Sequence, residues 1–176
     1  MRAALLTAAT AAVTAVVAVF SGPAWAASIG PGQIARALAR AERSSSLWAT
    51  VNICNSRRYP DALGVRGQMP ALGFAAQLTM NVRVGYWSGS KRRFIPIQAS
   101  AATNTLQLGR RTHGLQQDGA VFTFRPHTGL LNATITFSWT RAGKILGQVH
   151  RRTTGGHPGA DFGSPPKYSA AQCRIP

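Results

Sequence analysis

Hydrophobic and polar residues alternate with a period of two along most of the chain after residue 46. The clearest stretch is residues 78–86, where Leu, Met, Val, Val and Tyr occupy every second position between polar residues or glycine. This alternation places one face of a β-strand against a core and the other toward solvent. Seven strands are predicted in this way, over residues 47–54, 74–87, 93–98, 105–109, 120–125, 131–139 and 144–152.

The segments between these strands carry turn residues. Residues 55–70 contain prolines and glycines and are predicted to be a loop, as are residues 153–172. Pro96 lies inside one predicted strand and places that strand at the edge of a sheet, because a central strand needs the missing N–H. The short connections, without a long helix between strands, predict an all-β fold, a single antiparallel two-sheet sandwich.

Two segments precede the strands. Residues 1–26 begin with the basic Arg2, continue as an apolar stretch and end in Ala24-Trp25-Ala26. This is the pattern of a signal peptide that is cleaved after Ala26. An uncleaved membrane anchor is the alternative, since the 18 residues 3–20 are just long enough to span a bilayer.

Residues 27–46 are predicted to be a basic lead-in with a short helix, because Ile34, Leu38 and Ala41 recur at helical spacing. The expected organisation is therefore a signal peptide (1–26), the lead-in (27–46) and a β-sandwich domain (47–176).

The charge balance is strongly basic. The chain of 176 residues has 20 Lys and Arg against 4 Asp and Glu, a formal net charge of +16. Removal of residues 1–26 would leave +15, more than solubility alone requires. A disordered polycation is excluded, because the apolar residues form ordered strand-like runs.

The two cysteines, Cys54 and Cys173, are expected to form a disulfide. Export would place them in an oxidising compartment, and no CxxC pair suggests a zinc site. The bridge would pin the C-terminal tail to the first strand of the domain.

Several segments together resemble small, largely uncharacterised exported proteins of high-GC actinobacteria. They are residues 48–54 opening the domain, Phe137-Ser138-Trp139 late in it, and residues 153–158 before a terminal cysteine. The strand pattern is similar to that of secreted immunoglobulin-like domains of about seven strands. The wide spacing of the cysteines departs from the usual disulfide between two core strands of such domains.

Candidate catalytic and metal-binding residues are sparse. The chain contains no GxSxG, SxxK or HExxH motif, and its four carboxylates are scattered. The four histidines show neither i,i+2 nor i,i+4 spacing, so neither a metal nor another cofactor is expected. A triad joining a histidine to Asp118 or Asp161 in space is the only enzymatic arrangement left open.

The basic residues are clustered and are mainly arginine, whose planar guanidinium binds phosphate, sulfate or carboxylate with two hydrogen bonds. If each connection reverses the chain direction, three tight connections share one end of the sandwich. A compact anion-binding pole is predicted there, made of Lys91, Arg92, Arg93, Arg110, Arg111, Arg141 and Lys144.

The sequence therefore predicts a secreted or cell-envelope-associated binding module that is not an enzyme. Its expected partners are anionic envelope polymers such as teichoic acids, acidic polysaccharides or an acidic protein, with nucleic acid bound only non-specifically. A small secreted hydrolase with a site between loops and a purely structural or partner-docking module are the alternatives. The oligomeric state is left open.

Overall fold

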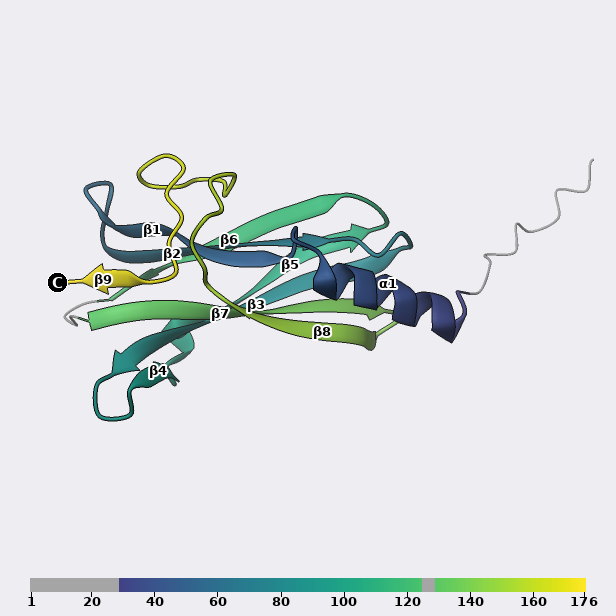
Figure 1. The fold of residues 1–176 in the computed structure, drawn as a ribbon, viewed down its shortest axis with the longest axis horizontal. Helices are drawn as coiled ribbons and strands as arrows, with labels where there is room; N and C mark the ends of the chain where they lie inside the picture. Colours follow the sequence, from purple (N-terminus) through teal and green to yellow (C-terminus); the bar gives the residue numbers. More distant parts are fainter. Residues whose placement is uncertain (1–28, 125–128) are drawn as a thin grey trace, which may run out of the picture.

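The computed structural model describes residues 29–124 and 129–176. The predicted signal peptide, residues 1–26, and its cleavage point therefore lie outside the described residues. Among the described residues, one α-helix and nine strands occur, and the strands form two antiparallel sheets packed face to face (Figure 1). The predicted all-β sandwich with an N-terminal helix is confirmed.

Sheet A has the order β1-β2-β6, with β1 at Trp48–Ser56, β2 at Tyr59–Pro70 and β6 at Leu115–Thr123. Sheet B has the path β4-β3-β7-β8, with β4 at Arg93–Pro96, β3 at Ala76–Ser88, β7 at Gly129–Arg141 and β8 at Lys144–Arg152. Two further strands extend it: β5 at Thr103–Arg111 pairs with β3, and β9 at Cys173–Ile175 pairs with β7.

The alternating pattern of β3 and β7 corresponds to one inward and one outward face. Their inward residues fill the space between the sheets and are fully buried, as Leu78, Met80, Phe137 and Trp139 illustrate. The intervening Thr, Asn, Arg and Ser residues face outward. Pro96 lies in β4 at the edge of sheet B, as predicted.

The prediction of a loop over residues 55–70 is wrong, because residues 59–70 form β2, the central strand of sheet A. Residues 62–67 are all buried, so β2 shows no alternation of exposed and buried positions. Gly64 and Gly67 in this strand lie against Ile53 and Ile135, where a β-carbon would collide with either side chain. A strand covered on both faces and interrupted by glycines lacks the period-two signal.

The C-terminal tail, residues 153–172, pairs along the open edge of β1 and reaches over part of the outer face of sheet A. Val51 and Ala170 exchange backbone hydrogen bonds of 2.9 and 3.0 Å. The Asn52 side chain donates to the Asp161 carbonyl at 2.8 Å. The tail is the yellow-green looped segment beside β1 and β2 in Figure 1. The tail is an irregular segment, as predicted. Its packing against sheet A helps to explain why most residues of β1 and β2 are buried.

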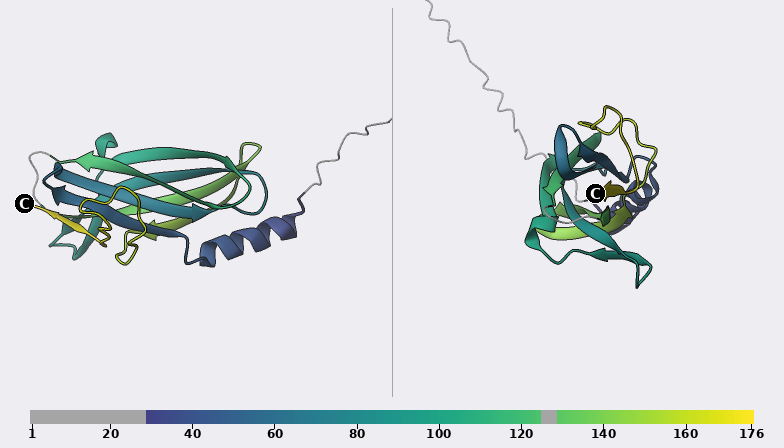
Figure 2. Two further views of the ribbon diagram at one scale, coloured as in Figure 1. Left: turned by 90° about the horizontal axis from the view of Figure 1, so that it is seen from above. Right: turned by 90° about the vertical axis from the view of Figure 1, so that its left-hand side faces the viewer.

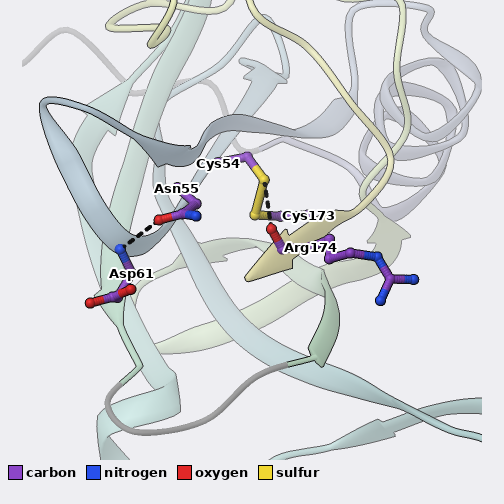
Figure 3. The surroundings of a disulfide bond; sticks show 5 residues. All are labelled: Cys54, Asn55, Asp61, Cys173 and Arg174. Carbon is purple, nitrogen blue, oxygen red and sulfur yellow. Dashed lines mark hydrogen bonds between the residues drawn. A yellow bond between two sulfur atoms is a disulfide. The ribbon is translucent and has the colours of Figure 1, made fainter. Parts of the chain in front are cut away.

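The predicted disulfide is present and joins the two sheets. Cys54 near the end of β1 is bonded to Cys173 at the start of β9 (Figure 3). Beside it, Asn55 adopts a left-handed backbone conformation with φ 38°, and its side-chain oxygen accepts a hydrogen bond from the Asp61 N–H at 2.9 Å. The bridge and the β7–β9 pairing together anchor the last residues of the chain.

Helix α1, at Pro31–Arg43, lies within the predicted lead-in and ends three residues before its last residue, 46. It packs against β8, where Gly147 leaves room for the Leu38 side chain. Arg151 on β8 donates a hydrogen bond to the Glu42 carbonyl at 2.6 Å. The basic helix is therefore a packing helix, and it runs roughly along the strand direction (Figure 2). Within residues 29–124 and 129–176, no helix has the length and apolar character needed to cross a membrane.

Candidate anion-binding surface

Charges of opposite sign are separated between the two sheets. The four side-chain carboxylates of the chain lie on α1, sheet A and the tail, as Glu42, Asp61, Asp118 and Asp161. The strands of sheet B carry no carboxylate side chain. They carry nine cationic residues: Arg83, Arg93, Arg110, Arg111, Arg141, Lys144, Arg151, Arg152 and Arg174. Sheet B is therefore the cationic layer of the sandwich.

Two of these arginines lie in one row across the outer face of sheet B. Strand register places Arg83 of β3 opposite Thr134 of β7, and Thr134 opposite Arg152 of β8. Arg83 and Arg152 are exposed, and their backbones are two strand spacings, about 9–10 Å, apart. The next row is Asn81, Thr136 and His150. The cationic side chains of Arg83 and Arg152 therefore lie on either side of the hydroxyl group of Thr134.

These two rows line a pocket of about 380 Å³, here called the sheet-B pocket. Its polar lining consists of amide, hydroxyl, imidazole and guanidinium groups from Asn81, Arg83, Asn132, Thr134, Thr136, His150 and Arg152. Phe94, Ile95 and Pro96 of β4 form its wall. A β-carbon at Gly85 would lie 3.0 Å from the Asn132 side-chain oxygen and 3.1 Å from the Ile95 carbonyl, so the glycine lets β4 approach closely.

The hydrogen bonds on this face hold the neutral groups and leave the arginines available. Thr136 Oγ1 and His150 Nδ1 are 2.9 Å apart. Asn81 donates to Thr105 Oγ1 of β5 at 2.8 Å. Neither Arg83 nor Arg152 makes a side-chain hydrogen bond or ion pair with another described residue. Their guanidinium groups are free to bind an anion from solution.

The predicted pole of seven cations is not formed, because its members lie at opposite ends of the sandwich. Strand β3 runs from Gln77, which pairs with Arg110 and Thr140, to Ser88, which pairs with Arg93. Arg110, Arg111, Arg141 and Lys144 therefore lie at one end, called the α1 end and drawn on the right in Figure 1. Lys91, Arg92 and Arg93 lie at the other, called the β9 end.

The physical reason is the unrecognised strand β2. It reverses β3 and β4 relative to the directions assumed, so the turn at residues 88–93 lies at the opposite end. A second cause is that β4 and β5 both run antiparallel to β3, so the connection at residues 97–102 does not reverse the chain. The later turns, at residues 112–114 and 142–143, therefore stay at the end assumed. Part of the predicted cluster remains, since Arg110 and Arg141 line one pocket of about 370 Å³ with Ala142. The anion-binding role of these seven residues stays a prediction.

Arg66 is a separate cation that faces away from the sheet-B pocket. It lies on the tail-covered face of sheet A and is only 9% exposed. Its guanidinium stacks on the Phe162 ring at 4.9 Å, and one nitrogen lies 3.9 Å from Asp118. Burial lowers the pKa of Arg66, while the charges of Asp161 and Asp118 raise it. Arg66 is therefore engaged within the protein and helps to hold the tail on sheet A.

The histidines do not gather around a common centre. His150 lines the sheet-B pocket, whereas His157 lies in the tail, stacked on Trp48 at a ring distance of 4.8 Å. His127 lies outside the described residues. Across the two described ranges, no three His, Cys, Asp or Glu residues come close enough to hold a metal ion.

Protonation of His157 should weaken the folded state, since burial lowers its pKa below the ordinary value of 6.5. The unfolded chain then takes up the proton first, so this residue reduces stability as the pH falls below about 6.5 and has no such effect above it. His157→Phe keeps a ring on Trp48 and cannot titrate. In urea unfolding, wild type should lose stability relative to this variant between about pH 6.5 and 5. A difference that stays constant over this range would contradict the assignment.

Sequence reasoning missed Arg83, which it treated only as a polar position within a strand. The β7–β8 hairpin was predicted, and it places Thr134 near Arg152. The pairing of β3 with β7 joins residues about fifty positions apart, and no local pattern indicates it.

Comparison with known proteins adds no relative from which a role could be transferred. The chain matches no protein-family model and no curated protein.

Proposed function

We propose that this protein is a secreted, non-enzymatic module that binds hydroxyl-rich anionic polymers, such as acidic polysaccharides, on the outer face of sheet B. The observation that carries the proposal is the pair Arg83 and Arg152, unpaired on either side of Thr134 in a sheet without carboxylate side chains. Two guanidinium groups with no internal partner attract an anion without first breaking an ion pair.

The neutral residues around the arginines favour a polymer rich in hydroxyl groups. Outward-facing Thr, Asn, Ser and Gln side chains form rows across β3, β7 and β8, including Thr79, Asn81, Thr136, Ser138 and Gln148. Amide and hydroxyl groups both donate and accept hydrogen bonds, so they suit sugar hydroxyls, while the arginines suit sulfate, phosphate or carboxylate substituents.

Secretion is part of the proposal and is supported by two features. The Cys54–Cys173 bridge is typical of proteins that fold in an oxidising compartment. The pattern of residues 1–26 is that of an export signal. An extracellular location would also place the cationic sheet next to the anionic polymers of a cell envelope.

The hydrolase alternative is not favoured by the placement of ionisable groups. His150 is the histidine of the sheet-B pocket, and the carboxylates Asp118 and Asp161 belong to sheet A and to the tail covering it. A histidine-based general base normally relies on a nearby carboxylate for orientation. We therefore propose binding without a chemical step.

Replacement of Arg83 and Arg152 by Gln should weaken binding to a fluorescein-labelled heparin dodecasaccharide by at least about tenfold, since a hydrogen bond to a charged group contributes roughly 1.5–3 kcal/mol. The salt dependence should also flatten, because fewer counterions are released per complex. Fluorescence anisotropy at several salt concentrations from about 50 to 200 mM measures both quantities.

Two double variants with the same loss of charge are the controls. Arg57→Gln with Arg58→Gln acts at the β9 end, and Arg110→Gln with Arg141→Gln acts at the α1 end. Each should weaken binding by less than about threefold, because long-range attraction depends on total charge while contact depends on position. Equal losses in all three double variants would mean that the charge acts diffusely and would refute a site on sheet B.

A further inference from the structure

A second cavity opens at the β9 end, between the two sheets. It has a volume of about 660 Å³ and lies between the ends of β3, β6 and β7 and the segment around the short 3-10 helix Ser100–Ala102. Thr123 and Phe124 bound it on the side of sheet A, and Tyr86 and Leu131 bound it on the side of sheet B. Its volume lies within the range of small-molecule binding pockets.

This cavity is distinct from the sheet-B pocket, although the same strands line both. Gly85 and Asn132 face the sheet-B pocket, whereas the next residues, Tyr86 and Leu131, line the second cavity. The two hollows share none of their described lining residues.

The chemistry of the second cavity is the opposite of that of the sheet-B pocket. None of its described lining residues is charged, in a chain with 20 Lys and Arg residues. Aliphatic and aromatic groups dominate the lining, including Ile97, Ala102, Phe124 and Leu131. An ion placed against these residues would lose hydration without gaining a counter-charge from them, so the described lining favours an uncharged ligand.

Two aromatic residues of the cavity remain accessible to solvent. Tyr86 is 43% exposed and Trp87 is 44% exposed, although the same strand buries Leu78, Met80 and Val82 completely. Trp87 contacts the Phe94 ring edge-on at 5.3 Å. Exposed aromatic groups beside an apolar hollow are typical of sites that bind ligands.

We propose that this cavity binds a neutral, mainly apolar molecule of drug-like size, such as an aromatic ring system or a short uncharged acyl compound. Tyr86 and Thr123 supply the hydroxyl groups that could orient one polar atom of the ligand. This site is independent of polymer binding on the outer face of sheet B.

The neutral fluorescent probe N-phenyl-1-naphthylamine tests the proposal, because an anionic probe would be attracted to the arginines. One probe per protein should bind with saturable enhancement of its fluorescence. Ala101 is an exposed lining residue, so Ala101→Phe should fill the entrance without disturbing the core and weaken probe binding at least about tenfold. Ala35→Phe, at an exposed position on α1, adds the same side chain far from the cavity and should bind as wild type.

A second readout locates the probe. Energy transfer from tryptophan to the bound probe should decrease in Trp87→Phe, which keeps an aromatic ring and removes the tryptophan that lines the cavity. Absence of saturable binding, or equal affinity in wild type and Ala101→Phe, would overturn the proposal. A loss of probe binding in the Arg83→Gln, Arg152→Gln protein, with Ala101→Phe unaffected, would place the probe in the sheet-B pocket and also overturn it.

Discussion

Replacement of both Cys54 and Cys173 by serine should lower the free energy of unfolding by roughly 4–5 kcal/mol. The bridge closes a segment of 119 residues in sequence separation, and the chain-entropy model assigns a loop of this size a stabilisation of about that magnitude. The native state also depends on the bridge, because it links sheet A to β9, where Cys173 and Ile175 are each 1% exposed. Urea unfolding followed by tryptophan fluorescence measures the effect.

The matched control removes a different tail contact. Ser56 and Ser164 share a hydrogen bond of 2.8 Å close to the bridge, and Ser56→Ala with Ser164→Ala should cost only about 1 kcal/mol. In unreduced wild-type protein, alkylation should label no thiol. A loss of less than about 1 kcal/mol in the double serine variant would show that the strands hold the C-terminus without the bridge.

Trp139→Ala should destabilise the protein by about 3–5 kcal/mol, the usual cost of removing a large aromatic side chain from a core. Trp139 is completely buried between the sheets. Its indole N–H donates to the carbonyl of Pro70, the last residue of β2, at 2.9 Å. The side chain thus joins sheet B to sheet A both by packing and by a partly buried hydrogen bond.

Two variants separate these contributions. Trp139→Phe keeps most of the packing but leaves the Pro70 carbonyl without this donor, so it should cost about 1–3 kcal/mol. Trp87→Ala removes the same side chain from a position that is 44% exposed and should cost clearly less than Trp139→Ala. Similar losses at positions 87 and 139, measured in urea, would contradict the placement of the core.

The sequence correctly predicts the strands that have one face buried in the core and the other exposed to solvent. In β3 and β7 the inward residues are apolar and the outward residues are polar, so the alternation of the sequence follows the fold directly. Strand β2 was not recognised because Gly64 and Gly67 lie within it and Pro60 and Pro70 lie near its ends, and these residues are typical of turns. The structure places both glycines where a β-carbon would collide with a neighbouring isoleucine.

The sequence predicts that the candidate site is cationic, but it does not predict where the site lies. Composition indicates that anions are attracted, and the excess of arginine is plain from the sequence. The location depends on the direction of each strand and on the pairing of β3 with β7, which brings Arg83 and Arg152 into one row. Arg92 lies at the opposite end from Arg110 and Arg141 for two reasons: strand β2 was missed, and β4 and β5 run in the same direction beside β3.

The most direct test of the binding surface is a map of backbone amide chemical shifts during titration with the heparin dodecasaccharide. A site on the outer face of sheet B predicts that the largest changes fall on residues 81–85, 132–136 and 150–152, which adjoin one another in sheet B. Residues 57–58, 91–93 and 110–111 should change little. Changes concentrated at either end of the sandwich, or spread evenly over all arginine clusters, would contradict the account.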